Sequence, residues 1–255
     1  MSDHTLHLSR PAAHVARIEI DAPPMNALGR GLRERFLETL DALEADLDVR
    51  ALIVTGRGRA FCAGDDLKEA RGRGEGAAEG VAHFARLHDR LEAFRAPTVA
   101  AVNGHCVGGG LELALCCDVR LAAREASFTC AGVNVGLMAS AWRLPRLIGV
   151  ARAKAMLLTG SPCDAAAAER AGLTASTHAG EALAQAALDL AVRIAGRAPL
   201  SVEATKRVAG RALDLDADAA RAAAEREIEA LVRTADHAEA LAAFAERRDP
   251  VFHRR

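Results

Sequence analysis

Asn103-Gly104-His105-Cys106-Val107-Gly108-Gly109-Gly110-Leu111-Glu112-Leu113 is the stretch that decides the fold. It follows Thr98–Val102, a short apolar run typical of a buried strand, and it leads into a helix expected over Leu111–Cys117. Glycine permits the sharp turn between the two elements and lets a ligand approach the main chain. Because the first N–H groups of a helix have no partner within it, this junction predicts a position that binds negative charge.

A second junction of the same kind is Phe61-Cys62-Ala63-Gly64-Asp65-Asp66-Leu67-Lys68, which leads into a short helix from about Asp66. Two backbone N–H groups, one from each junction, would form an oxyanion hole if they converged on one point. Removing one donor from such a hole typically costs roughly 3–4 kcal/mol of transition-state stabilisation. Glycine-rich turns are also ordinary connectors, and Asp65 and Asp66 also suit helix capping, so both interpretations stay open at this point.

Glu112 stands in the first helical turn after the quoted stretch. It follows Gly109 by three residues, and that spacing puts both on one face of the helix, about one turn apart. A carboxylate in apolar surroundings suits a general acid or base, although the helix dipole also favours a carboxylate in this turn. Lys68 is typical of a solvated charge and His105 of a turn or core histidine. The apolar neighbours of Glu112 are Leu111, Leu113, Ala114 and Leu115.

The sequence around both junctions alternates strands, turns and helices, which is typical of an α/β layer fold. Two strands are expected near the start, Thr5–Ser9 and His14–Asp21, and Asn26 is a candidate N-cap for the helix that follows. After about Ala179 the pattern is wholly helical, and Pro199 marks a boundary. We therefore predict a core over residues 1–198, which carries the site, and a helical module over residues 199–255.

The composition is that of a folded soluble protein, with 255 residues of which 51% are apolar and 26% charged. Lys and Arg number 33 against 34 Asp and Glu, so no global positive field attracts nucleic acid. The six cysteines form no C-x-x-C pair, which favours buried thiols in a reducing compartment over disulfides or zinc. The sequence shows neither a signal peptide nor an apolar run of membrane-spanning length. We expect a cytoplasmic protein that binds neither membrane nor nucleic acid.

Taken in order, these motifs resemble the crotonase (enoyl-CoA hydratase/isomerase) superfamily along nearly the whole chain. The resemblance implies a crotonase-like spiral of ββα units that forms two near-perpendicular sheets. It also implies that the helical C-terminal module drives assembly into a homotrimer or into a dimer of trimers, a hexamer. The segments that carry the resemblance are Pro24–Leu28, Phe61–Lys68, Thr98–Gly104, Gly108–Ala114, Cys117-Asp118, Leu157–Gly160 and Ala168–Leu173.

The same resemblance implies an acyl-CoA thioester substrate and the roles of particular residues. The oxyanion donors would be the N–H groups of Asp65 and Gly109, and Glu112 would be the first of the two glutamates that hydratases of this family use. Coenzyme A enters as part of the substrate, so no separate cofactor is expected. No metal is expected either, because no His/Cys/Asp cluster has ligand spacing. The residues that would line the adenine and pantetheine path are Ala63, Asp65, Asp66, Leu67 and Lys68.

The second glutamate is the main departure from the family pattern. Counting on from Phe128, its position is taken by Gly132, and no carboxylate lies between Ser127 and Pro145. The chain therefore keeps the oxyanion hole but only half of the acid/base pair.

Two smaller departures concern the neighbourhood of the site. Asp65 is larger than the Ala or Gly often found there, so its carboxylate has to point away from the enolate or it would oppose it. The usual Gly-Gly-Thr run is replaced by Ser140-Ala141-Trp142-Arg143, in which Trp142 suits either a narrowed acyl pocket or a packed core.

Three functions stay open on the sequence alone. The preferred one is syn hydration or isomerisation of an enoyl-CoA, with Glu112 as general acid/base. A second is another crotonase-type reaction, namely decarboxylation, thioester hydrolysis or C–C cleavage, of which decarboxylation needs the enolate hole but no base at the α-carbon. The third is non-catalytic acyl-CoA binding, against which a retained buried carboxylate counts.

The candidate phosphate contacts are Arg30, Arg33 and Lys68, with Arg247 or Arg248 of a neighbouring subunit.

Overall fold

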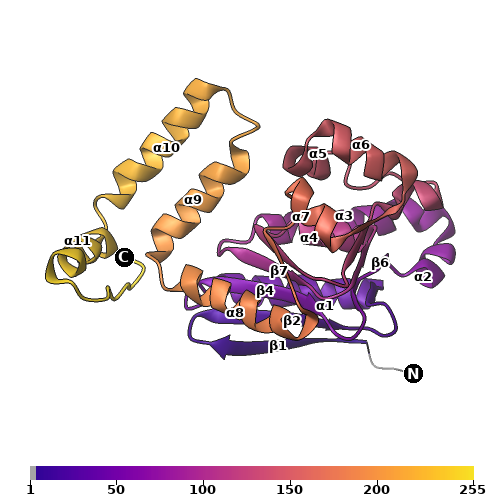
Figure 1. Ribbon diagram of the computed structural model, residues 1–255, viewed down its shortest axis with the longest axis horizontal. Coiled ribbons are helices and arrows are strands. Elements are labelled where there is room, and N and C mark those ends of the chain that lie inside the picture. The colour runs from indigo at the N-terminus through magenta and orange to yellow at the C-terminus, as the bar shows by residue number, and fades with distance from the viewer. Residues whose placement is uncertain (1–3) are drawn as a thin grey trace.

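Six strands form the large sheet of the computed structural model, which describes residues 4–255 (Figure 1). Their order is β1-β2-β4-β7-β9-β12; the β1–β2 pair is antiparallel and the other pairs are parallel. β4 and β7 are apolar runs that are buried almost throughout, as parallel strands covered on both faces require. The strands are β1 (Thr5–Ala12), β2 (Val15–Asp21), β4 (Ala51–Gly56), β7 (Thr98–Val102), β9 (Val119–Ala123) and β12 (Ser176–His178).

A four-stranded sheet in the order β11-β10-β8-β5 lies beside the large sheet, and β3 pairs with β6 separately. β4, β7 and β9 are successive neighbours in the large sheet, while β5, β8 and β10 are successive neighbours in the small one. The chain therefore advances by one strand in each sheet per turn, which confirms the predicted crotonase-like α/β spiral. The strands are β3 (Ala27–Leu28), β5 (Ala60–Cys62), β6 (Gly64–Asp65), β8 (His105–Val107), β10 (Ser127–Thr129) and β11 (Pro162–Asp164).

The core helices close the turns of this spiral and cover its sheets. α8 packs on the large sheet through Leu183, Ala187 and Ala191, and the two small alanine side chains let the helix approach closely. None of the helices in residues 4–255 is long and apolar enough to cross a membrane. The helices are α1 (Arg30–Ala45), α2 (Leu67–Arg71), η1 (Gly74–Gly76), α3 (Ala77–Glu92), α4 (Gly109–Leu115), η2 (Ala131–Val135), α5 (Arg143–Ile148), α6 (Val150–Thr159), α7 (Ala165–Ala171) and α8 (Gly180–Ala195).

The C-terminal helices stand beside the core rather than on it (Figure 1). They are α9 (Pro199–Arg211), α10 (Ala217–Leu231) and α11 (Ala235–Glu246), and α10 has no buried residue. Buried Glu203 on α9 binds Arg95 of the core and Arg254 of the C-terminal tail, each at 2.6 Å. α9 begins next to the predicted boundary, while the division into two domains stays a prediction.

The prediction that Asn26 caps a helix is wrong. α1 begins at Arg30 after Gly29, and Asn26 is a buried residue with a φ of +55°. Its side chain accepts the Ala22 N–H at 2.9 Å and donates to the Ala60 carbonyl at 2.6 Å. Asn26 therefore cross-links the turn before β3 to β5, the strand whose last two residues open the second junction.

The cysteines are free thiols, as the sequence indicated. All six lie in the described part of the chain, and each is buried except Cys163, which is half-buried. Burial raises the pKa of the Cys62 thiol to about 12, so this group stays protonated at neutral pH.

Candidate active site

The two junctions singled out in the sequence come together where α4 begins against β6. A Cβ on Gly64 would lie 2.6 Å from the Gly109 nitrogen, and Gly64 also has a φ of +85°. A Cβ on Gly110 would lie 2.0 Å from the Cys62 carbonyl oxygen, so α4 also packs tightly on β5. These contacts admit glycine alone. The Asp65 N–H and the Gly109 N–H therefore belong to backbone segments that touch.

Gly109 is held from its other side by α3. A Cβ at this position would lie 1.9 Å from Phe84 Cε1, so the aromatic ring packs directly on the main chain. His88, one turn further along α3, bonds through Nε2 to the Gly109 carbonyl oxygen at 3.0 Å. Burial lowers the pKa of His88 to about 4 despite the nearby Glu112 carboxylate, so the ring is neutral and donates here. As the first residue of α4, Gly109 has an N–H without a partner inside the helix.

Glu112 lies in the first turn of α4 and is 6% exposed. Its Oε2 accepts the Ser140 hydroxyl at 2.6 Å, and its Oε1 accepts Nη1 of Arg143 at 2.6 Å. The wholly apolar surroundings expected from the flanking leucines are therefore wrong, because the carboxylate has a buried ion pair. The leucines point into the core, whereas Glu112 faces the turn before α5.

Arg143 connects this carboxylate to α3. Its Nη2 lies 2.7 Å from Glu92 and 3.1 Å from Asp89, and its guanidinium carbon lies 4.2 Å from the ring centre of Trp142. Trp142 is 53% exposed, so the packed-core interpretation of this residue is wrong. The tryptophan instead covers the outer side of the ion pair between Arg143 and Glu112.

Gly132, the position of the second family glutamate, is closed off by backbone. A Cβ there would lie 2.9 Å from the Leu137 carbonyl oxygen and 3.0 Å from the Ala139 nitrogen. The Leu137 N–H also donates to the Gly132 carbonyl at 2.8 Å. The turn after η2 therefore folds back over Gly132 and brings Ser140, which has a φ of +60°, to Glu112.

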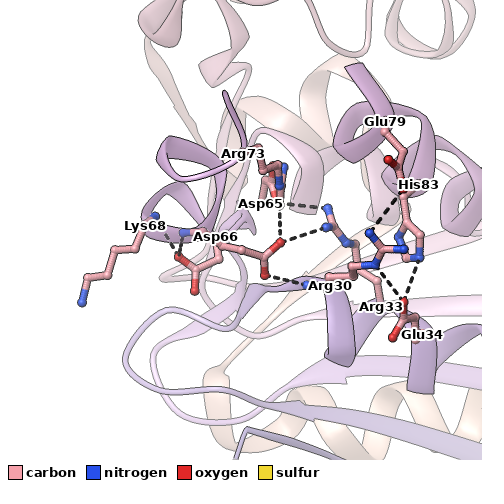
Figure 2. Close-up of polar contacts among 10 residues, drawn as sticks. Arg30, Arg33, Glu34, Asp65, Asp66, Lys68, Arg73, Glu79 and His83 are labelled. Carbon is pink, nitrogen blue, oxygen red and sulfur yellow. Dashed lines mark hydrogen bonds and ion pairs between the residues drawn. The ribbon is translucent and has the colours of Figure 1, made fainter. Parts of the chain in front are cut away.

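Asp65 directs its carboxylate toward a group of arginines, as Figure 2 shows. Its Oδ1 accepts Nη1 of Arg33 at 3.0 Å and Nη2 of Arg73 at 2.8 Å, and its Oδ2 accepts Nη1 of Arg73 at 2.5 Å. Glu69 binds Arg73 at 2.6 Å from the same side. The sequence analysis predicts that this carboxylate points away from the enolate. The guanidinium groups of Arg33 and Arg73 hold it in its observed direction.

The remaining predicted binding residues lie along the start of α2. The Ala63 N–H donates to the Met25 carbonyl at 3.0 Å. Asp66 is the N-cap of α2 and accepts the Lys68 N–H at 2.9 Å, so its capping interpretation is confirmed. Leu67 and Lys68 are exposed, and the Lys68 side chain extends away from the arginine group (Figure 2).

The candidate phosphate contacts differ in their accessibility. Arg33 is wrong as such a contact, because it is 1% exposed and its guanidinium is bound to Asp65. Arg30 is exposed and pairs with Glu34 at 3.0 Å, and Arg248 pairs with Glu239 in the C-terminal helices. Within residues 4–255, no group of three or more His, Cys, Asp or Glu side chains is placed to hold a metal ion.

Ser140 and Arg143 are site residues that the sequence pattern did not predict. The available signal was the Ser140-Ala141-Trp142-Arg143 run in place of the family's Gly-Gly-Thr, of which only the tryptophan led to a prediction. The contacts to Glu112 span 28 and 31 residues of sequence, and no helical or strand period predicts such a distance.

Comparison with known proteins places this site in a family. The family model for enoyl-CoA hydratase/isomerase matches residues 10–255. The probable enoyl-CoA hydratase EchA12 of Mycobacterium tuberculosis is 37% identical over 96% of this chain and 91% of its own. The 2,3-dehydroadipyl-CoA hydratase of Escherichia coli K12 is 33% identical over 97% and 93%.

Solved structures agree with this result. The enoyl-CoA hydratase from Bacillus anthracis superimposes with a TM-score of 0.96 and 31% identity, over 98% of this chain and 99% of that one. A putative enoyl-CoA hydratase/isomerase from Mycobacterium abscessus gives a TM-score of 0.92 at 34% identity, over 98% and 100%. The chain therefore belongs to the enoyl-CoA hydratase/isomerase family and is a crotonase-type acyl-CoA enzyme.

Proposed function

We propose that this enzyme adds water to the double bond of a 2-enoyl-CoA thioester. The N–H groups of Asp65 and Gly109 hold the thioester oxygen, and Glu112 is the general acid and base. The observation that carries this proposal is the position of Glu112, a buried carboxylate one helical turn from Gly109 on the same face of α4. Backbone donors aimed at a developing oxyanion are usually the largest electrostatic contribution to such catalysis.

The proton and electron movements balance with one glutamate. The water oxygen bonds to carbon 3 while Glu112 takes a proton from the water, and the electrons of the double bond move onto the thioester oxygen. The enolate then takes a proton from Glu112 at carbon 2, which restores the carboxylate. Each carboxylate oxygen can accept about two hydrogen bonds, so each keeps a position for water beside the contacts to Ser140 and Arg143.

The coenzyme A part of the substrate follows the start of α2 in this proposal. Ala63, Leu67 and Lys68 lie there in sequence order. Within residues 4–255 the exposed Lys68 ammonium has no ion-pair partner, unlike Arg30, Arg33 and Arg73. A compact ammonium suits phosphate as a point charge. Because the substrate carries its own coenzyme A, the reaction needs no separate cofactor.

A second candidate reaction is favoured by the closed backbone at Gly132. Decarboxylation of a malonyl-type thioester forms the enolate by loss of carbon dioxide, so it needs the oxyanion hole but no base at carbon 2. Thioester hydrolysis and C–C cleavage belong to the same group of alternatives. A panel of malonyl-, acyl- and 3-hydroxyacyl-CoA thioesters separates these reactions from hydration by the mass of the product.

Turnover of crotonyl-CoA, followed by loss of the enoyl-thioester absorbance, tests the proposal. We expect Glu112→Gln to lower kcat by roughly 100-fold or more, which is the usual contribution of a general acid or base. Glu92→Gln is the matched control, because it removes a carboxylate from the opposite side of Arg143, and we expect it to lose far less. Equal rates for wild type and Glu112→Gln would refute the role of Glu112. Binding of crotonyl-CoA without turnover would favour the second group of reactions.

The assembly proposed for this enzyme is a trimer or a dimer of trimers. Large apolar side chains are exposed on the C-terminal helices, among them Ile228, Val232, Leu241 and Phe244. A monomer rarely leaves so many apolar groups in water on one module, since burying each stabilises an interface. Sedimentation equilibrium measures the mass directly, and a monomeric mass at micromolar concentration would contradict this proposal.

A further inference from the structure

We infer that Arg33 and Arg73 are positioning residues that keep the Asp65 carboxylate out of the oxyanion hole to which the Asp65 N–H contributes. The inference rests on the proposed function, because it needs the Asp65 and Gly109 N–H groups to bind the thioester oxygen. It concerns one reaction step, the formation of the enolate.

The need for such restraint follows from covalent geometry. The carboxylate of an aspartate can never move far from its own main-chain nitrogen. The Gly109 N–H, at the start of α4, attracts nearby anions, and the Asp65 carboxylate is kept close to it because Gly64, the preceding residue, touches Gly109. Even outside the hole, a unit negative charge roughly 5 Å from the developing enolate, at an effective dielectric of about 20, would slow its formation roughly 300-fold.

The observed contacts hold both oxygens of this carboxylate. Arg73 binds it in a two-point contact at 2.5 and 2.8 Å, and Arg33 adds a third bond at 3.0 Å (Figure 2). Two parallel N–H contacts from one guanidinium fix orientation as well as distance. Glu69 binds Arg73 at 2.6 Å, so the clamp has a carboxylate partner even without Asp65.

Arg33 also supports the second donor. Its guanidinium carbon lies 5.2 Å from the ring centre of Phe84, the ring that packs directly on Gly109. A cation at this distance over the face of an aromatic ring is attracted to the ring. The buried Arg33 guanidinium therefore contacts the carboxylate of Asp65 and the Phe84 ring, which packs on Gly109. Through these contacts it supports both residues that donate to the proposed hole.

Arg73 reaches Asp65 because the start of α3 leaves room for its side chain. A Cβ on Gly80 would lie 2.7 Å from Cδ and Nη1 of Arg73, so the guanidinium passes directly over this glycine. The link between α2 and η1, which carries Arg73, is thereby tied to β6 through one side chain.

A double-mutant comparison tests the inference. We expect Arg73→Met to lower kcat for crotonyl-CoA roughly 10- to 100-fold, because the carboxylate is released toward the hole. Asp65→Ala keeps the N–H and removes the charge, so Arg73→Met in the Asp65→Ala background should stay within about threefold of Asp65→Ala alone. Arg33→Met should follow the same pattern with a smaller loss. Arg90→Met is the control, since Arg90 also joins α3 to α1 through Asp41 but lies outside the cluster.

A binding measurement separates failure of this inference from failure of the proposed function. The probe is 4-dimethylaminocinnamoyl-CoA, whose absorbance moves to longer wavelength when hydrogen bonds polarise its thioester carbonyl. We expect a shift with wild type and with the Asp65→Ala/Arg73→Met protein, and a reduced shift with Arg73→Met. A full shift with Arg73→Met, or an equal loss of kcat in both backgrounds, overturns the inference alone. No shift with wild type overturns the proposed hole and the inference together.

Discussion

Glu112 has both carboxylate oxygens occupied by side chains that come from the same turn of the chain. Ser140 binds one oxygen and Arg143 the other, and neither bond exceeds 2.6 Å. A carboxylate held at both oxygens has one orientation, which suits the acid/base role proposed for Glu112.

Replacing Ser140 by Ala is expected to lower kcat by roughly tenfold or more with little change in KM. The lost bond is made to a charged, buried group, and such bonds contribute about 1.5–3 kcal/mol. Steady-state kinetics with crotonyl-CoA measure the effect. Ser140→Gly is the matched variant, because it removes the same hydroxyl and relieves the φ of +60°. If the two variants differ widely, backbone strain rather than the hydroxyl sets the rate.

His88 gives the protein a specific dependence on pH. Its pKa in the folded protein is lowered to about 4 by burial, so below about pH 6.5 the unfolded chain binds a proton that the folded protein does not. Titration of His88 therefore leaves the free energy of unfolding unchanged above this pH and lowers it as the pH drops toward 4. We expect the His88 ring to account for about 2 kcal/mol of the loss between about pH 7.5 and about pH 5.

Urea unfolding at both pH values, with wild type and His88→Gln, measures this contribution. The glutamine keeps a donor for the Gly109 carbonyl but does not titrate. The same pH dependence in both proteins would show that other groups cause it.

At the scale of elements, the helices and buried strands follow from sequence pattern, and the turns do not. The apolar run of β7 was predicted at its observed bounds, and the predicted helical pattern after about Ala179 matches α8 to α11. Asn26 was misplaced because its side chain bonds to Ala60, 34 residues away, and this contact overrides its preference for a helix N-cap. Turn conformation here is set by distant partners.

The turn after η2 is an element whose conformation has a testable consequence. Gly132→Glu should not restore a two-glutamate site, since even a Cβ would lie 2.9 Å from the Leu137 carbonyl oxygen. Overpacking of this kind costs about 1–3 kcal/mol, so we expect lower stability and no gain in hydration rate. Urea unfolding and crotonyl-CoA turnover check both parts.

Gly31→Glu, at an open position in the first turn of α1, is the control and should keep its stability. A faster hydratase from Gly132→Glu would show that the turn opens easily and that its closure does not explain the missing glutamate.

At the scale of the whole molecule, sequence predicted the spiral and the separate helical end but not what joins them. The family motifs predicted the two junctions, which lie together in the structure, and the position of Glu112, since each motif is a local run of residues. Arg95, Glu203 and Arg254 come from three distant parts of the chain, and 108 residues separate the first two. No local pattern reports such a contact.

Glu203→Met is expected to destabilise the protein by about 3 kcal/mol or more, because it leaves two arginines near the buried position without their carboxylate. Thermal and urea unfolding measure the loss. Arg221→Met, which removes a fully solvated ion pair with Asp218, should change stability by less than about 0.5 kcal/mol. Comparable losses for the two variants would mean that Glu203 does not secure the helical end.

The molecule has a single tryptophan and no tyrosine, and that tryptophan stacks on the arginine that binds Glu112. All of its intrinsic indole fluorescence therefore originates next to Arg143, the partner of Glu112. Emission from this enzyme therefore reports on the surroundings of Glu112, the proposed acid/base residue, without background from other aromatic side chains that emit at the same wavelength. Ligand binding and loop movement near Trp142 are expected to change this emission in the unlabelled wild-type protein.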